Sequence, residues 1–271
     1  MMMAGIATAQ AEPDTIKIGS LGWEDVYPLS LIGKKVLEKG GFKVEIVKFS
    51  EWGIANAALA KGDVDLLISL PNYVTADYWA KFKHRLEKIS PVSYGNFQGF
   101  VVPSYVPINS IDQLNTISDK VGGKIVGIEP GSGLMHQVHD AVKAYGLNYQ
   151  VIDGSTAAMT AELQSALERK EPIVTMLWKP SWMALKFDVK FLKDPKHVMQ
   201  PLDTYYWTAT RGFSEKHPHA REAIASMYVP LDDITALNVA INEGKTFEQA
   251  VDAWWDQNKA VVDSWAIAAA K

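Results

Sequence analysis

The chain has 271 residues, of which 48% are apolar, 10% are aromatic and 21% are charged, and its formal charge is −4 at pH 7. This composition is typical of a globular protein with one large domain or two of medium size. The negative charge argues against a nucleic-acid or anionic-membrane surface. No stretch is apolar for long enough to predict a transmembrane helix.

The N-terminal segment is small and apolar, and Ala9-Gln10-Ala11 has the small-x-small pattern found before a secretory cleavage site. No Lys or Arg precedes it, so the usual basic region is missing. We expect residues 1–13 to be a partial signal peptide or a disordered tail, and the protein to be exported to the periplasm. The sequence contains no cysteine, so we expect neither disulfides nor a lipid-modified N-terminal cysteine.

Short runs with the character of strands alternate with longer helical patterns along most of the chain. The predicted strands are Ile16–Leu21, Phe42–Phe49, Val64–Leu70, Gly99–Val102, Lys124–Ile128, Tyr149–Ile152 and Ile173–Leu177. The predicted helices are Tyr27–Glu38, Ala55–Lys61, Leu134–Tyr145 and Ala157–Arg169, and from His217 onward the chain reads as helices only. Such alternation predicts an α/β protein whose sheets are covered by helices.

Two extended stretches, 101–114 and 205–213, have the character of connections between two lobes. If both are hinge strands, residues 104–205 form an inserted second lobe, and residues 14–103 with 206–271 form the first. Each lobe then has the size of a small α/β domain. Two lobes joined by two strands can close on a ligand.

The stretch GIEPGSGLMHQV at 127–138 leads from a predicted strand through a tight turn into a helix. Exposed backbone N–H groups at the start of a helix are suited to bind a carboxylate or a phosphate. The spacing matches neither nucleotide-binding glycine motif. The alternative is an ordinary strand–turn–helix with Ser132 as N-cap.

Enzyme motifs are absent from the sequence, which has no G-x-S-x-G, no H-E-x-x-H and no cysteine nucleophile. We therefore expect a protein that is not an enzyme and needs no cofactor. His136 and His139 lie three residues apart on a predicted helix, but two histidines on an exposed face are more often solvated than bound to a metal. No metal site is expected.

The sequence contains nine tryptophans, and their positions suggest different roles. Those in the C-terminal helices and Trp79 are expected to pack in the interior. Trp23 and Trp178 each follow a predicted strand directly, where the ligand sites of open α/β sheets lie. Trp52 and Trp207 are left without a predicted role.

Several segments together resemble the substrate-binding proteins of glycine betaine and quaternary-amine ABC importers. They are KIVGIEPGSGLM, AAMTAEL, KEPIVTMLWKPSWM, FLKDPK, TRGF, ALAKGDVD and FQGFVVPSYVPINSIDQL, and they lie between about residue 16 and residue 250. The resemblance implies a two-lobed periplasmic-binding-protein fold, with two mixed sheets flanked by helices, two hinge strands and an aromatic cage between the lobes.

Site residues also follow from this resemblance. Trp23 and Trp178 fall on two of the family's cage tryptophans, and Gly133 and Leu134 fall on the backbone pair that holds the ligand carboxylate. Trp182 matches a second tryptophan of the motif, and we interpret it as structural support behind Trp178.

The third cage tryptophan of the family begins a W-L-P-N stretch, and this chain has Ser69-Leu70-Pro71-Asn72 in its place. A family histidine a few residues later is absent as well, and Val74 lies near its position. We expect Ser69 to line the cleft and Tyr73 to offer a replacement ring face.

These observations predict a solute-binding protein, expected to be a monomer, that captures a small methylated onium compound and delivers it to an ABC permease. The missing cage ring leaves other solutes open, namely choline, carnitine, a sulfonium betaine or another amine. A ligand-sensing module is the alternative from another class, and an enzyme is disfavoured by the missing motifs.

Overall fold

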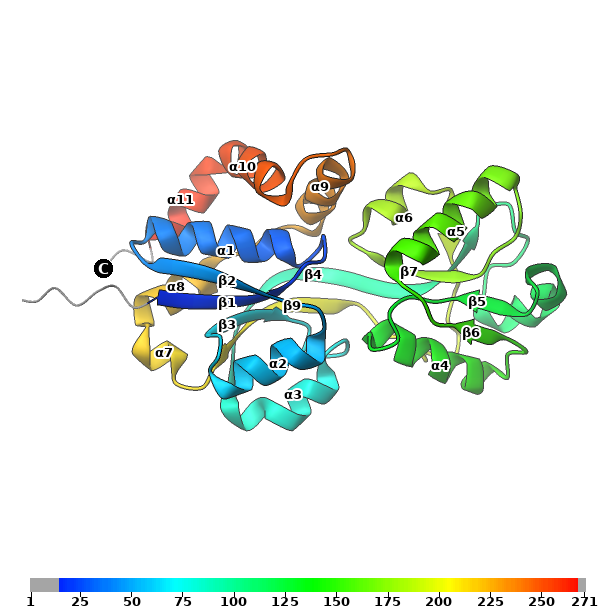
Figure 1. Cartoon of the computed structure of the whole chain (residues 1–271), viewed down its shortest axis with the longest axis horizontal. Helices are drawn as coiled ribbons and strands as arrows, with labels where there is room; N and C mark the ends of the chain where they lie inside the picture. The colour runs from blue at the N-terminus through cyan, green and yellow to red at the C-terminus, as the bar shows by residue number, and fades with distance from the viewer. Residues whose placement is uncertain (1–14, 268–271) are drawn as a thin grey trace, which may run out of the picture.

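The computed structural model describes residues 15–267, which form two lobes side by side along the longest axis (Figure 1). The expected signal peptide or tail at 1–13 lies outside the described residues. The predicted strands and helices are all present, with ends within a few residues of the expected ones, apart from one strand that is much longer. The two-lobed α/β architecture predicted from the sequence is confirmed.

Lobe I contains a mixed sheet with the strand order β2-β1-β3-β9-β4. Its strands are β1 (Thr15–Leu21), β2 (Lys43–Phe49), β3 (Leu66–Ser69), β9 (Asp203–Thr210) and the first part of β4 (Leu86–Pro103). Strands β1, β2 and β3 are parallel, whereas β9 is antiparallel to both β3 and β4. The carboxyl ends of the three parallel strands therefore meet at one edge, where a ligand site is expected.

Helices cover both faces of this sheet (Figure 1). They are α1 (Tyr27–Lys39), α2 (Trp52–Lys61), α3 (Ala76–Phe82), α7 (Phe213–Lys216), α8 (Pro218–Ser226), α9 (Leu231–Asn242), α10 (Phe247–Gln257) and α11 (Lys259–Ile267), with a 3-10 turn at Lys83–Arg85. Helix α1 lies on one face with α8, α10 and α11 against it, and α2 and α3 lie on the other. Up to residue 267, helices are the only regular elements after residue 212, which agrees with the helices predicted from His217 onward.

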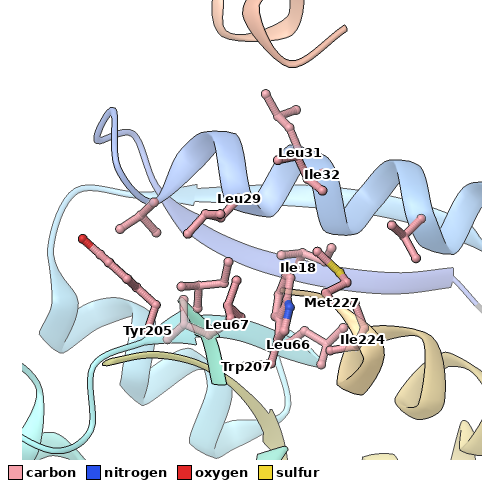
Figure 2. Packing of buried hydrophobic residues seen from close by; sticks show 14 of the residues in the cluster. Ile18, Leu29, Leu31, Ile32, Leu66, Leu67, Tyr205, Trp207, Ile224 and Met227 are labelled. Carbon is pink, nitrogen blue, oxygen red and sulfur yellow. The ribbon is translucent and has the colours of Figure 1, made fainter. Parts of the chain in front are cut away.

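Trp207 is central to the core of lobe I and is fully buried among Ile18, Leu66, Ile224 and Met227 (Figure 2). A β-carbon added at Gly33 of α1 would lie 2.5 Å from the Trp207 ring, so the glycine lets the helix approach the indole closely. This tryptophan therefore packs in the interior of lobe I and takes no part in the cleft.

Lobe II is smaller and contains the end of β4 with β5 (Lys124–Val126), β6 (Gln150–Ile152), β7 (Thr175–Lys179) and β8 (Val189–Phe191). The order is β4-β7-β5-β6, and β8 pairs with β4 as well. The helices of this lobe are the 3-10 helix Ile111–Val121, α4 (Gly133–Tyr145), α5 (Thr156–Arg169) and α6 (Trp182–Lys186). A second buried cluster, separate from the core of lobe I, fills this lobe.

Strand β4 runs through both lobes, which joins the two sheets (Figure 1). Its partner changes from β9 at Asn96 to β7 at Phe97, and the chain returns between Met199 of the second cluster and Asp203 of β9. Both crossings lie a few residues before the lobe boundaries at 104 and 206 that the sequence predicts. At the first crossing, β4 continues from one lobe into the other as a single strand.

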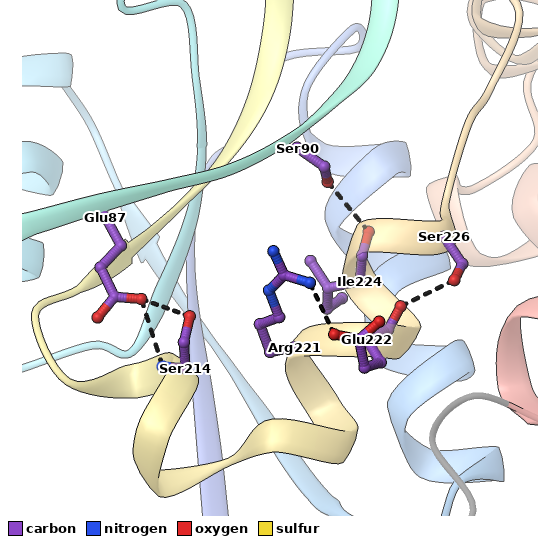
Figure 3. A network of polar contacts seen from close by, with 7 residues as sticks. All are labelled: Glu87, Ser90, Ser214, Arg221, Glu222, Ile224 and Ser226. Carbon is purple, nitrogen blue, oxygen red and sulfur yellow. Dashed lines mark hydrogen bonds and ion pairs between the residues drawn. The ribbon is translucent and has the colours of Figure 1, made fainter.

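Polar side chains fix the short helix α7 and the helix α8 to β4 (Figure 3). Glu87 accepts hydrogen bonds from the Gly212 and Ser214 amides at 2.6 and 3.3 Å. The Ser90 hydroxyl donates to the Ile224 carbonyl at 3.4 Å. These contacts hold the start of the C-terminal helices against the strand that crosses between the lobes.

Among the described residues, no single helix is long and apolar enough to cross a membrane, and one pair, α8 with α9, passes that test together while bent by 88°.

Candidate functional site

A cleft of about 670 Å³ lies between the two lobes and is lined by residues of both. Lobe I supplies the loop after β1, the start of α2 and the segment after β3. Lobe II supplies the start of α4, the first turns of α5, and the β7–α6 segment. The carboxyl ends of β1, β3 and β7 therefore all deliver side chains to the same cleft, as the strand topology predicts.

Four tryptophans line the cleft, namely Trp23, Trp52, Trp178 and Trp182. Trp23 and Trp52 come from lobe I and meet edge to face, with ring centroids 5.5 Å apart. Trp178 lies in β7 and Trp182 is the first residue of α6, both in lobe II. Aromatic surface thus reaches the cleft from both lobes, an arrangement that suits a cation without hydrogen-bond donors.

The structure brings Trp182 to the cleft together with Trp178, although the sequence predicts only a supporting role for it. Both rings also pack against the core of lobe II, and Trp182 contacts Phe187 with ring centroids 5.4 Å apart. Trp52 is only 3% exposed, so it mainly supports Trp23 from behind. The sequence signal for Trp52 is its position three residues after β2, at the carboxyl end of a parallel strand.

The start of α4 also faces the cleft, and Gly133 and Leu134 are part of its lining. Ser132 is the N-cap, and its hydroxyl accepts from the Met135 amide at 3.3 Å. The amides of Gly133 and Leu134 precede the first intrahelical hydrogen bond, so they are available to an anion at the positive end of a 13-residue helix.

Ser69 and Tyr73 are not brought to the cleft. Ser69 ends β3 inside lobe I, 1% exposed, with its hydroxyl 2.8 Å from that of Thr75. Tyr73 is 45% exposed and is not part of the lining. Their neighbours Leu70 and Val74 line the cleft instead, so this wall is aliphatic.

Two carboxyl groups follow Trp23 directly and were not singled out from the sequence. Asp25 is 8% exposed and accepts a hydrogen bond from the Tyr205 hydroxyl at 2.7 Å. Burial raises the pKa of Asp25 to about 6. Burial, together with the charge of Asp25, raises the pKa of Glu24 to about 8, and a hydrogen bond from Trp182 opposes this shift. The signal available in the sequence is the position of Glu24-Asp25 just after the first strand.

The two lobes touch across the cleft. A β-carbon added at Gly133 would lie 2.7 Å from the Val74 carbonyl oxygen, so the start of α4 lies directly against the segment after β3. The Lys186 ammonium donates to the Asn242 side chain at 3.4 Å, which links α6 to α9. These contacts describe a closed arrangement of the lobes.

The two histidines of α4 do not form a metal site with neighbouring groups. His139 lies 3.9 Å from the Asp153 carboxylate, at the surface. Over the part of the chain that the structure describes, no group of three or more His, Cys, Asp or Glu side chains is placed to hold a metal ion.

Comparison with known proteins agrees with this geometry. Residues 14–257 match the family described as the substrate binding domain of ABC-type glycine betaine transport systems. The chain is 34% identical over 157 residues to the glycine betaine/carnitine transport binding protein GbuC of Listeria monocytogenes, a match that covers 57% of this chain and 52% of the relative. It is 24% identical over 282 residues to the glycine betaine-binding periplasmic protein OusX of Dickeya dadantii, covering 89% and 85%.

Among solved structures, lactococcal OpuAC in its closed-liganded conformation with glycine betaine is similar to this chain. The TM-score is 0.86 at 28% identity, covering 93% of this chain and 99% of that one. The matched stretch of the Listeria relative spans about half of its length, whereas the fold match spans nearly all of both chains. The chain therefore belongs to the family of substrate-binding domains of ABC-type glycine betaine transport systems.

Proposed function

We propose that this protein captures a small methylated onium compound between its lobes and delivers it to the membrane permease of an ABC importer. The observation that carries this proposal is the cleft itself, where tryptophans from both lobes and the start of α4 face the same space. Family membership supports the transport role, because members of the family are substrate-binding proteins of such importers. Glycine betaine is the first ligand to test, because the family and its relatives are named for it.

The physical chemistry of an onium group fits this lining. A quaternary ammonium has no N–H to donate, so it is held by ring faces and apolar contact, at about 0.5 to 2 kcal/mol for each cation–π contact. Trp23 and Trp178 are the rings that we assign to it, with Trp182 beside them. A ligand carboxylate is then held by the amides of Gly133 and Leu134.

The aliphatic wall of Leu70 and Val74 bears on ligand size. An aromatic ring in this wall would reduce the space beside the onium group. The smaller side chains of Leu70 and Val74 leave that space open. Choline, carnitine or a sulfonium betaine therefore belong in any test of the ligand. We propose that the bound compound leaves unchanged, because the family consists of substrate-binding domains.

The remaining parts of the proposal concern place and partners. We propose that the protein acts outside the cytoplasmic membrane, as the periplasmic relative does, and as a monomer. The chain carries a formal net charge of −4, which disfavours nucleic acid as a partner. Closure of the lobes on the ligand forms the surface that the permease recognises.

A thermal-shift panel of onium compounds against the purified protein tests this function. At about a hundred times its dissociation constant, a ligand stabilises the folded state by about 2.7 kcal/mol. We expect glycine betaine, choline or a close analogue to raise the melting temperature, and glycine and alanine to leave it unchanged. A flat response to all the onium compounds would contradict the proposal.

A further inference from the structure

Glu24 places a carboxyl group in the cleft with one oxygen that has no protein partner. The residue follows Trp23 in the loop between β1 and α1 and is part of the cleft lining. Its Oε1 atom is buried and accepts no hydrogen bond from the described residues. A buried acceptor without a partner costs about 1 to 3 kcal/mol, and more if it is charged, so Glu24 is an unsatisfied group at the cleft.

The other charged groups of the cleft do not neutralise Glu24. Asp25 carries the same sign and is held by Tyr205. Glu129 accepts from the amide and hydroxyl of Thr156 at 3.0 and 2.8 Å. The fourth charged group of the lining, Lys179, has its ammonium over the rings of Phe97 and Phe191, at 5.7 and 5.8 Å. Within residues 15–267, no Lys, Arg or His forms an ion pair with Glu24.

The surroundings of Glu24 match the needs of a methylated cation. The carboxyl group follows Trp23 in lobe I and takes a hydrogen bond from Trp182 of lobe II. A quaternary ammonium between such rings brings a positive charge to the carboxylate without requiring a donor. Coulomb attraction at close range is much stronger in a closed cleft than in water.

We propose that Glu24 is the counter-ion of the onium group and favours ligands with a net positive charge, such as choline, over zwitterions such as glycine betaine. The inference rests on the proposed function and deepens it, because it concerns the charge class of the same ligand. A zwitterion gains less from Glu24, since its own carboxylate already offsets part of its positive charge and is repelled by a second carboxylate.

The binding of a cation beside Glu24 is linked to the release of a proton from this side chain. Because burial raises the pKa of Glu24 to about 8, the group is mostly protonated at neutral pH. A cation that binds to the carboxylate form must displace that proton into solvent. The apparent affinity then falls by at most about tenfold for each pH unit below the pKa. Neither choline nor glycine betaine titrates in this range, so the linkage belongs to the protein.

Isothermal titration with choline and with glycine betaine, from about pH 6 to about pH 9, tests the proposal. Each titration is repeated in two buffers of different ionisation enthalpy, which counts the protons released. We expect wild type to release up to one proton for each choline bound near neutral pH, and to bind choline more tightly as the pH rises towards 8. Glu24→Gln should release no proton on binding above about pH 7. Any pH dependence of the choline affinity that remains near pH 6 is then due to Asp25.

Two variants complete the design. Glu24→Gln should weaken choline binding at high pH by at least about tenfold and glycine betaine binding by less. Glu24→Asp keeps the charge, so it should keep the pH dependence even where the shorter side chain lowers the affinity. Glu38→Gln, on the outer surface of α1, controls for a change in net charge and should behave as wild type.

Choline binding that is as tight in Glu24→Gln as in wild type at high pH would overturn the role of Glu24. Equal losses for choline and glycine betaine in Glu24→Gln would overturn the charge selection. If wild type binds no onium compound at any pH, the proposed function fails and this inference fails with it. Onium binding that Glu24→Gln leaves unchanged contradicts the inference alone.

Discussion

The tryptophans of the cleft differ in how much of each ring packs against the interior of the protein. Trp52 is almost fully buried and supports Trp23, whereas Trp178 and Trp182 divide their surfaces between the core of lobe II and the cleft. Rings held by packing on one face lose little entropy when the other face meets a ligand. In the proposed function, Trp23, Trp178 and Trp182 form a preorganised cation site.

Trp178→Ala tests that site. Removing one ring face should weaken the binding of an onium ligand by about tenfold or more, since a cation–π contact is worth about 1 to 2 kcal/mol when it is desolvated. Because Trp182 also lines the cleft, Trp182→Ala should weaken binding as well. Trp255→Ala is the matched control, since Trp255 lies on α10 with Lys35 over its ring and is absent from the lining. Calorimetric titration compares the three, and an affinity unchanged in Trp178→Ala would contradict the assignment.

The acidic pair makes the stability of the unliganded protein depend on pH. The pKa of Glu24 is raised from 4.5 to about 8 on folding, so the folded state binds more protons than the unfolded state between these values. The contribution of Glu24 to the free energy of unfolding should therefore fall as the pH rises from about 5 to about 8, by at most about 1.4 kcal/mol per unit.

Urea denaturation of wild type and Glu24→Gln at several pH values measures this effect. The glutamine has no proton to lose, so the variant should gain stability relative to wild type as the pH rises through this window. A difference that is constant from pH 5 to pH 8 would show that Glu24 keeps an ordinary pKa in the folded state.

At the scale of elements, the site is assembled where strands end and helices begin. The strand–turn–helix at 127–138 was predictable, because glycines and an N-cap serine after a buried strand have a local conformational meaning. The opposite wall of the cleft, formed by the segment after β3, was not predictable. Ser69 and Tyr73 each lie one position before Leu70 and Val74, and which of them faces the cleft depends on how the segment after β3 folds back.

Gly133→Ala tests the contact between α4 and that segment. The added carbon would lie 2.7 Å from the Val74 carbonyl oxygen and hold the lobes apart, so ligand affinity should fall by about tenfold or more. Stability without ligand should be kept, because alanine is a better helix residue than glycine. Gly131→Ala is the control, since Gly131 is absent from the cleft lining and the nearest heavy atom lies at an ordinary 3.7 Å from its added carbon. Equal ligand affinities in the two variants would contradict a closed arrangement with this contact.

Glu87→Ala tests how the C-terminal helices are attached. The side chain accepts two backbone amides and a hydroxyl at the start of α7, and alanine leaves these donors without a protein partner. We expect the free energy of unfolding to fall by about 1 to 3 kcal/mol, with ligand affinity unchanged at temperatures where the variant is folded. Urea denaturation measures the loss, and a loss below about 0.5 kcal/mol would show that water replaces these contacts.

At the scale of the whole molecule, two cores are joined by one long strand and one return segment. The alternation of strands and helices was enough to predict both lobes, because each element carries its own periodicity. The full length of β4 was not predictable, since its first part contains charged residues, Pro91 and three register shifts against β9. The acidic pair was missed for a different reason, because burial and a missing partner are properties of the assembled cleft.

In the proposed function, the two lobes close on an onium group held by tryptophans from both. A crystal structure of the protein with the onium compound that stabilises it most tests this closure directly. We expect the methyl groups of the ligand against the rings of Trp23 and Trp178, with Glu24 beside them and both lobes in contact with the ligand. A ligand bound to one lobe alone, or outside the ring of tryptophans, would contradict it.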